Sequence, residues 1–139
     1  MLTDEHVHPN VTAAFGLQLR TVEASRVWRF RGRDERDYLQ ELYKDNVVFA
    51  TSDRVFVNEV LGTPRKHAGI VYLPNESSGH DLEIFAEVAS IFIAGGCRSS
   101  PRAFHNCVLY PTKEGIYLVK GDKPSELVFS WLWLFDTPE

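Results

Sequence analysis

The stretch Val47-Val48-Phe49-Ala50-Thr51-Ser52-Asp53 decides the expected fold. It begins with four apolar residues in a row, and such a run without polar alternation is typical of a strand covered on both faces of its sheet. The run Gly69-Ile70-Val71-Tyr72-Leu73 has the same character and is stopped by Pro74. Strands of this kind belong to parallel sheets that carry helices on both faces.

Helix signals lie around these two runs. Asp34 is a good N-cap, and four residues then recur at helical spacing on one face: Tyr38, Leu39, Leu42 and Tyr43. A longer helix is expected from Gly79 to Ala94, with Gly95-Gly96 as its stop. Nearer the N-terminus, Val11 to Phe15 predicts a short helix, and the alternation in Leu17 to Val22 predicts a strand.

The last part of the chain changes character, because three β-like runs follow one another with turn residues between them. These runs are Cys107 to Tyr110, Ile116 to Val119 and Leu127 to Phe135, and they predict a hairpin or meander. Strands that alternate with helices up to residue 95 predict right-handed βαβ units. We therefore expect a single α/β domain over residues 1–139, with three α/β/α layers and a mainly parallel sheet, in which 1–95 form the βαβ core and 96–139 the C-terminal strands.

Composition limits the class of protein. The chain has 139 residues, of which 44% are hydrophobic and 24% charged, as is ordinary for a domain with its own core. Cys97 and Cys107 match no metal spacing or disulfide framework, so we expect reduced thiols in a cytoplasmic protein. We expect neither a membrane span nor a signal peptide. The net charge of −4 argues against a nucleic-acid binder that relies on a broad positive field, so any basic surface must be local.

Acidic residues recur where the predicted strands end or the helices begin. In open parallel sheets, ligands bind beyond the carboxyl ends of the strands, at the point where the strand order reverses. Carboxylate oxygens suit Mg²⁺ and Mn²⁺, and a cation held in this way can activate a water for attack on a phosphodiester. The alternative interpretation, in which these acids are helix caps, turn residues and surface charges, stays open. The acids concerned are Asp4, Glu5, Asp34, Glu35, Asp37 and Asp53.

Four segments, taken in chain order, resemble the small PIN-like family. They are Leu2-Thr3-Asp4-Glu5-His6-Val7, Gly32-Arg33-Asp34-Glu35, the stretch from Val47 to Asp53 quoted above, and His67-Ala68-Gly69-Ile70-Val71. The resemblance runs from residue 2 to about residue 73, and a looser similarity continues through the long helix and the final strands. Members of this family are stand-alone ribonucleases, often the toxin halves of toxin–antitoxin pairs. The resemblance implies a metal-dependent endoribonuclease that uses Mg²⁺ or Mn²⁺ on an RNA substrate and pairs with a small antitoxin protein.

The resemblance also implies roles for particular residues. Asp4 and Asp53 would be metal ligands, and the acid that opens the middle helix would be a third. For this third ligand we prefer Asp34, while Glu35 and Asp37 stay open as alternatives.

Three further positions follow from the same resemblance. The hydroxyl of Thr51 would orient the site or a bound water, and Glu5 would be a ligand or an outer partner of one. The family usually carries a second acid two residues beyond the aspartate of its Thr-x-Asp motif, but Val55 stands there in this chain. Because fewer carboxylates bind a metal more weakly, the alternative function is a catalytically weak or inactive PIN-like module that binds or regulates.

An arginine-rich segment precedes the middle helix and surrounds two aromatic residues, Trp28 and Phe30. Arginine contacts phosphate and stacks on bases, so these side chains could guide RNA to the acidic residues. The alternative is a solvated charged loop, and we expect both aromatic rings to be anchored in the core. The residues predicted to bind RNA are Arg29, Arg31, Arg33, Arg36 and Arg54.

The segment His6-Val7-His8 is a weaker metal signal. Alternating histidines after an aspartate resemble the opening of metal-dependent hydrolases with TIM-barrel-like folds. Such barrels need roughly 200 residues or more, so we interpret the two histidines as a surface or structural pair.

The C-terminal strand is apolar on both faces. Four aromatic residues alternate along it and therefore share one side: Phe129, Trp131, Trp133 and Phe135. Since the sheet covers one side only, the other needs helices or a partner subunit, which predicts a homodimer through this strand.

Overall fold

The computed structural model describes residues 1–4, 7–28, 30–63, 65–73, 79–121 and 123–130, and the side chains of 79–81 are outside this description. In this part of the chain the strands form one seven-stranded sheet in the order β2-β1-β3-β4-β5-β6-β7. The strands are β1 (Leu2–Thr3), β2 (Val22–Glu23), β3 (Phe49–Thr51), β4 (Ile70–Tyr72), β5 (Cys107–Pro111), β6 (Gly115–Lys120) and β7 (Glu126–Ser130). The helices are α1 (Pro9–Phe15), a 3₁₀ turn η1 (Ala24–Arg26), α2 (Glu35–Lys44), α3 (Arg54–Gly62) and α4 (Gly79–Ser99).

The sheet is parallel from β2 to β5 and antiparallel from β5 to β7. This confirms the predicted α/β class, the mainly parallel sheet and the C-terminal meander. In the central register Leu2 lies beside Phe49, Phe49 beside Ile70, and Ile70 beside Val108. Four apolar residues in adjacent strands therefore form one row across the middle of the sheet.

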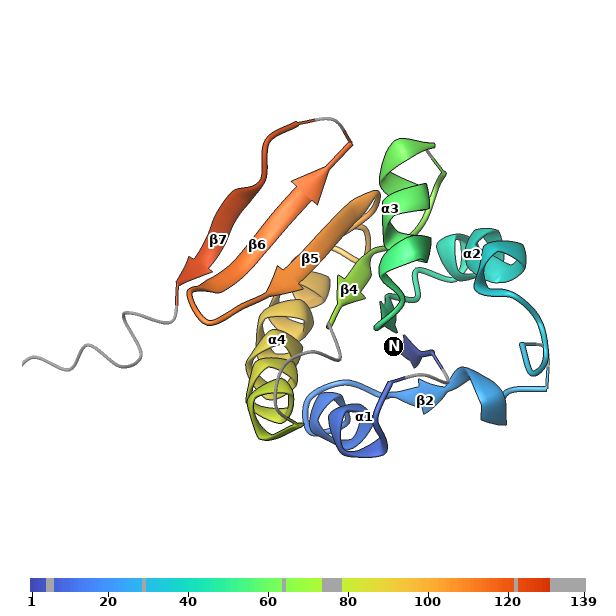
Figure 1. Cartoon of the computed structure of the whole chain (residues 1–139), viewed down its shortest axis with the longest axis horizontal. Coiled ribbons are helices and arrows are strands. Elements are labelled where there is room, and N and C mark those ends of the chain that lie inside the picture. The colour runs from blue at the N-terminus through green and yellow to red at the C-terminus, as the bar shows by residue number, and fades with distance from the viewer. Residues whose placement is uncertain (5–6, 29, 64, 74–78, 122, 131–139) are drawn as a thin grey trace, which may run out of the picture.

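Helices cover both faces of the sheet. Neighbouring residues of each central strand point to opposite faces, and both sets of side chains are apolar, so each face needs a cover. In β3, Phe49 packs with residues of α2 and α3, whereas Ala50 packs with residues of α1 and α4. Both side chains are fully buried. Figure 1 shows α1 beside α4 and, away from them, α2 beside α3. Burial of a ring such as Phe49 contributes about 1.5–3 kcal/mol to the stability of the fold. Because helices cover both faces of the sheet, every residue of the run before Thr51 can be apolar.

The predicted strand from Leu17 to Val22 is wrong over most of its length. Turns follow α1 directly, with the N–H of Leu19 bonded back to the carbonyl of Phe15 at 3.1 Å, and Leu17 is 63% exposed. Only Val22 and Glu23 pair, beside β1 at the edge of the sheet. Because β2 has only two residues, the sequence carries almost no alternation of apolar and polar residues by which to locate it.

The predicted helix stop at Gly95-Gly96 is also wrong, since α4 continues to Ser99. Gly96 serves a close contact instead of a helix end. A Cβ at this position would lie 2.5 Å from the Phe104 ring, so only glycine lets this ring rest on the helix.

Other predictions fall partly outside the description. Strand β7 ends at Ser130, and the aromatic residues from 131 onward lie beyond the described residues. None of the helices in the described ranges combines the length and the apolar character needed to cross a membrane.

Candidate active site

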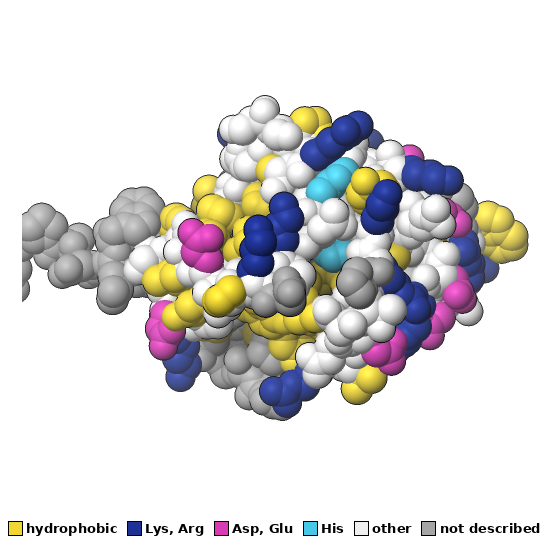
Figure 2. All heavy atoms as spheres, turned by 90° about the horizontal axis from the view of Figure 1, so that it is seen from above, with side chains coloured by type: hydrophobic (Ala, Val, Ile, Leu, Met, Phe, Trp, Pro, Cys, Tyr) yellow, Lys and Arg dark blue, Asp and Glu magenta, His cyan; other side chains and the backbone are white. Residues whose placement is uncertain are grey.

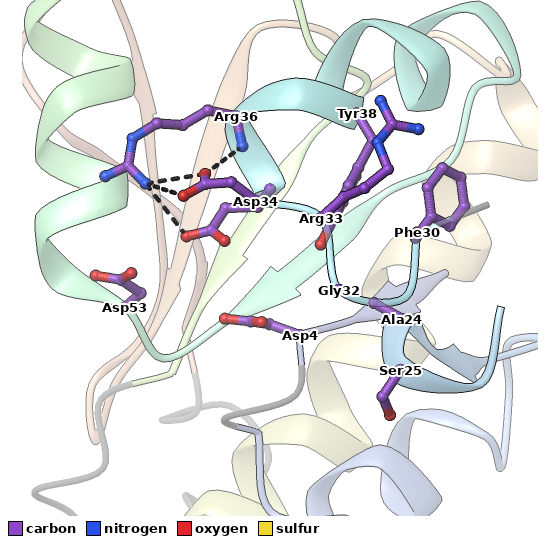
Figure 3. A pocket seen from close by; sticks show the side chains of 11 residues that line it. Asp4, Ala24, Ser25, Phe30, Gly32, Arg33, Asp34, Arg36, Tyr38 and Asp53 are labelled. Carbon is purple, nitrogen blue, oxygen red and sulfur yellow. Dashed lines mark hydrogen bonds and ion pairs between the residues drawn. The ribbon is translucent and has the colours of Figure 1, made fainter. Parts of the chain in front are cut away.

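The order of the strands reverses between β1 and β3. The chain leaves β1 toward α1 on one face of the sheet and leaves β3 toward α3 on the other. In open parallel sheets this divergence opens a crevice at the carboxyl ends of the two strands, which is where ligands bind. A pocket of about 440 Å³ lies there, called the acidic pocket below (Figure 3). Its lining consists of Asp4, Ala24, Ser25, Phe30, Gly32, Arg33, Asp34, Glu35, Arg36, Tyr38 and Asp53.

Asp4 is fixed at the end of β1 and is 4% exposed. Its backbone N–H donates to the carbonyl of Ala50 at 2.9 Å, so the aspartate continues the pairing of β1 with β3. The hydroxyl of Thr51 donates to Asp4 Oδ2 at 3.1 Å. A buried carboxylate is costly unless it is bonded or paired, and this contact holds it in one orientation.

Thr51 also orients the residue that caps α3. Its Oγ1 accepts from the backbone N–H of Asp53 at 3.0 Å. Asp53 is the N-cap of α3, and its Oδ1 accepts from the N–H of Phe56 at 3.1 Å. One hydroxyl therefore connects the buried Asp4 to the helix cap, and both carboxylates line the acidic pocket.

The third carboxylate of the pocket belongs to Glu35, the first residue of α2. Burial raises the pKa of Glu35, and the charges of Asp4, Asp34 and Asp53 raise it further. Like charges that face one another disfavour ionisation, so the electrostatics place Glu35 within the influence of both Asp4 and Asp53.

Asp34, the preferred third ligand, is occupied differently. As N-cap of α2 it accepts from the N–H of Arg36 at 2.9 Å, and the Arg36 guanidinium binds the same carboxylate at 3.0 Å. These bonds hold the pKa of Asp34 below its ordinary value, the backbone bond being the larger cause. The Asp34 side chain is 50% exposed against 14% for Glu35. Figure 3 shows Arg36 reaching over Asp34 at the rim of the pocket.

The arginines predicted to bind RNA are engaged in several ways. Arg36 pairs with Asp34, with Glu35 at 3.7 Å and with Glu59 of α3, while Arg33 pairs with Glu41 at 3.1 Å. The Arg36–Glu59 pair was missed, because no local spacing relates a residue in the middle of α3 to the start of α2.

Arg31 and Arg54 do not line the pocket. The Arg31 guanidinium lies 5.8 Å from the centre of the Trp28 ring, Arg54 is exposed in the first turn of α3, and Arg29 lies outside the described residues. The prediction that both aromatic rings are anchored in the core is right for Phe30, at 4% exposed, and wrong for Trp28, at 83%.

Several other predicted residues add nothing to the pocket as described. Glu5 and His6 lie outside the described residues, and His8 caps α1 by accepting from the N–H of Asn10. Asp37 is exposed in the first turn of α2 and does not line the pocket. Val55, in the place of the second acid, is 64% exposed.

Among the residues that the structure describes, no three His, Cys, Asp or Glu side chains form a group compact enough to hold one ion. The donor set of the pocket is nevertheless all oxygen, which suits a hard cation that keeps much of its water and takes one or two carboxylates.

No protein-family model, curated protein or solved structure matches this chain. The pocket itself and the sequence resemblance are therefore the grounds for a function.

Proposed function

We propose that this protein is a metal-dependent endoribonuclease that hydrolyses RNA phosphodiester bonds in the acidic pocket. One observation carries the proposal: carboxylates from three separate segments, at Asp4, Glu35 and Asp53, line one pocket at the reversal of the strand order. The choice of RNA as substrate comes from the resemblance to PIN-like ribonucleases. In this proposal Glu35 replaces Asp34 as the ligand from the middle helix.

The electrostatics of the pocket support cation binding. The raised pKa of Glu35 means that its ionised form is disfavoured, first by burial and then by the neighbouring acids. A Mg²⁺ or Mn²⁺ ion would offset this cost, and one or two of the carboxylates of Asp4, Glu35 and Asp53 would hold it while it keeps much of its water. When bound, the cation would supply Lewis-acid stabilisation to the phosphate oxygens and lower the pKa of the attacking water.

Two side chains of the protein would contribute by holding the carboxylates of the pocket in place. Thr51 holds Asp4 and the backbone of Asp53 in a fixed relation through two hydrogen bonds. Arg36, at the rim, is paired with Asp34, Glu35 and Glu59, so it fixes the wall of the pocket. Outer partners that orient ligands are worth about 10–100-fold in activity or metal affinity, so Thr51 is a positioning residue in this scheme.

The finer family assignment is part of the same proposal. Helices on both faces of the sheet are consistent with the three-layer PIN-like arrangement, and membership would make a small antitoxin protein the expected partner. Cytoplasmic residence follows from that assignment.

The second candidate is an inactive PIN-like module that binds or regulates. It is favoured by the exposed Val55 in place of an acid and by the absence of a compact three-ligand group among the described residues. Calorimetric titration with Mn²⁺ separates the two functions, because the inactive module has no saturable binding at millimolar metal.

The decisive experiment compares two matched variants. Asp53→Asn and Asp34→Asn each remove one negative charge. Both introduce an asparagine, which is itself a good N-cap, so the start of the helix stays capped. Asp53→Asn should lower Mn²⁺-dependent RNA cleavage by roughly 10²–10³-fold, since a bound metal supplies several kcal/mol to the transition state. Asp34→Asn should change the rate by less than about threefold, because Arg36 already occupies that carboxylate. Equal loss in both variants, or none in Asp53→Asn, would contradict the proposed ligand set.

A further inference from the structure

A second groove starts at the rim of the acidic pocket and runs between α2 and the loop after α3. It has a volume of about 450 Å³ and is called the basic groove below. Its lining contains four basic residues and no acidic residue among those that the structure describes. The lining consists of Arg36, Leu39, Gln40, Tyr43, Lys44, Arg65 and Lys66.

The groove is continuous with the acidic pocket, because Arg36 lines both. Arg65 lies near the same rim, since its charge helps to lower the pKa of Asp34 and of Glu59. Arg36 is paired with both of these acids and with Glu35. The free positive charge of the groove therefore belongs to its other basic residues.

The uncompensated charge of the groove lies where α2 and α3 end. In the described part of the chain, Lys44, Arg65 and Lys66 have no carboxylate within ion-pair distance. Figure 2 looks onto this end of the molecule and shows Lys and Arg side chains gathered beside the histidines. A local row of cations in a chain of net charge −4 is a surface suited to a polyanion.

An aromatic side chain stands beside these cations. Tyr43 is half-buried, and its ring lies 4.8 Å from the His105 ring, centre to centre. His105 Nε2 lies 2.8 Å from Asn46 Oδ1, which fixes the imidazole against the tyrosine. Burial lowers the pKa of His105, so this support is uncharged near neutral pH. A partly exposed tyrosine ring held by a neighbouring ring is a platform on which a base can stack without regard to sequence.

From this arrangement we infer that the basic groove binds single-stranded RNA, with its phosphates on Lys44, Arg65 and Lys66 and one base on Tyr43. The inference rests on the proposed function for the identity of the polyanion. It also moves the main RNA contacts away from the arginine-rich segment before α2, where Arg33 is already paired with Glu41. An acidic peptide could also use the cations, but it would gain nothing from the aromatic ring.

Binding can be measured apart from cleavage. A fluorescently labelled oligoribonucleotide of about ten nucleotides, a length within the usual range for single-strand sites, is titrated in EDTA, and anisotropy gives the dissociation constant at several salt concentrations. Lys66→Gln and Lys44→Gln should each reduce the slope of log K against log salt by about 0.7, the value for one phosphate contact on a single strand. The matched control is Arg98→Gln, which removes an exposed cation from the end of α4 on the opposite face of the sheet and should leave the slope unchanged.

The aromatic contact has its own pair of variants. Tyr43→Leu should weaken RNA binding by roughly 5- to 100-fold, whereas Tyr43→Phe, which keeps the ring, should bind within about twofold of the parent. Thermal unfolding of both variants separates loss of the ring from loss of the fold.

Three results would overturn the inference. The first is an unchanged salt slope in both lysine variants, and the second is a slope that falls equally in Arg98→Gln. The third is displacement of RNA by an oligoglutamate of the same charge as effectively as by unlabelled RNA. The cleavage assay distinguishes this from failure of the proposed function: groove variants should raise KM for RNA and keep kcat. If the parent protein cleaves RNA in a metal-dependent way but the groove variants bind RNA as well as the parent does, the groove inference is wrong and the proposed function stands.

Discussion

The acidic pocket and the basic groove share Arg36 as a common wall but treat like charges in opposite ways. The pocket gathers carboxylates where Asp4 is 4% exposed, and burial, together with the neighbouring charges, raises the pKa of Glu35. The groove spreads cations over exposed positions such as Lys44 and Lys66, where water screens them. The pocket therefore carries an electrostatic cost that a bound cation would remove, whereas the groove holds its charge at almost no cost.

The largest effect on stability is expected inside the pocket, at Thr51. Thr51→Val removes a buried hydroxyl that Asp4 and the N–H of Asp53 both use, and an unsatisfied buried polar group costs about 1–3 kcal/mol. Chemical denaturation should show this loss. Thr51→Ser, which keeps the hydroxyl, is the control and should retain the metal affinity of the parent. A valine variant as stable as the parent would show that this hydroxyl does not hold the two aspartates.

A smaller effect of opposite sign is expected at Glu35. Its pKa in the folded protein is raised above the ordinary value of 4.5, so the folded state holds the proton more tightly than the unfolded state does. Stability therefore falls as the pH rises from the ordinary value through the raised one. Glu35→Gln should raise the melting temperature by about 1–3 °C near pH 7, since solvent at the pocket mouth screens part of the repulsion.

The same substitution should make no difference near pH 4, where the parent carboxyl is already protonated. Mn²⁺ should raise the melting temperature of the parent more than that of the variant, because a ligand stabilises only the state that binds it. A variant that melts below the parent at both pH values would contradict the assumed repulsion.

The smallest effect is expected in the groove. Lys66→Ala should change the free energy of unfolding by no more than about 0.5 kcal/mol, as for most exposed positions. A gain of more than about 1 kcal/mol would show that the cations repel one another as the buried carboxylates do, and the contrast between the two regions would then disappear.

The central sheet could be predicted from the sequence because burial on both faces leaves a clear mark. Every residue from Val47 to Ala50 is apolar, and the two faces of β3 meet different helices. The edge strand β2 leaves no such mark, since Val22 and Glu23 are not buried. Gly96 was misread for a related reason: a glycine at a close contact with Phe104 looks the same in sequence as a glycine that ends a helix.

The sequence has a similar limit at the candidate site, where it could not distinguish between two adjacent acids. The sequence indicated that an acid at the start of the middle helix belongs near Asp4 and Asp53, but the choice between Asp34 and Glu35 depends on helix rotation. An N-cap side chain turns back to bond the first turn of its own helix, as Asp34 does with Arg36. The next residue, Glu35, is more buried and also lines the pocket, where its carboxylate lies 3.7 Å from the Arg36 guanidinium. The basic groove was not predicted, because Lys44 and Arg65 come together only through packing of α2 beside α3.

The shared wall at Arg36 has a thermodynamic consequence. The Arg36 guanidinium lines both the pocket and the groove, so a cation in one and nucleic acid in the other, as proposed above, would be coupled through its ion pairs with Asp34, Glu35 and Glu59. Such coupling is reciprocal: the factor by which nucleic acid in the groove changes the affinity for a cation equals the factor by which the cation changes the affinity for nucleic acid. Through this one arginine, binding measured at one site would reveal the occupancy of the other.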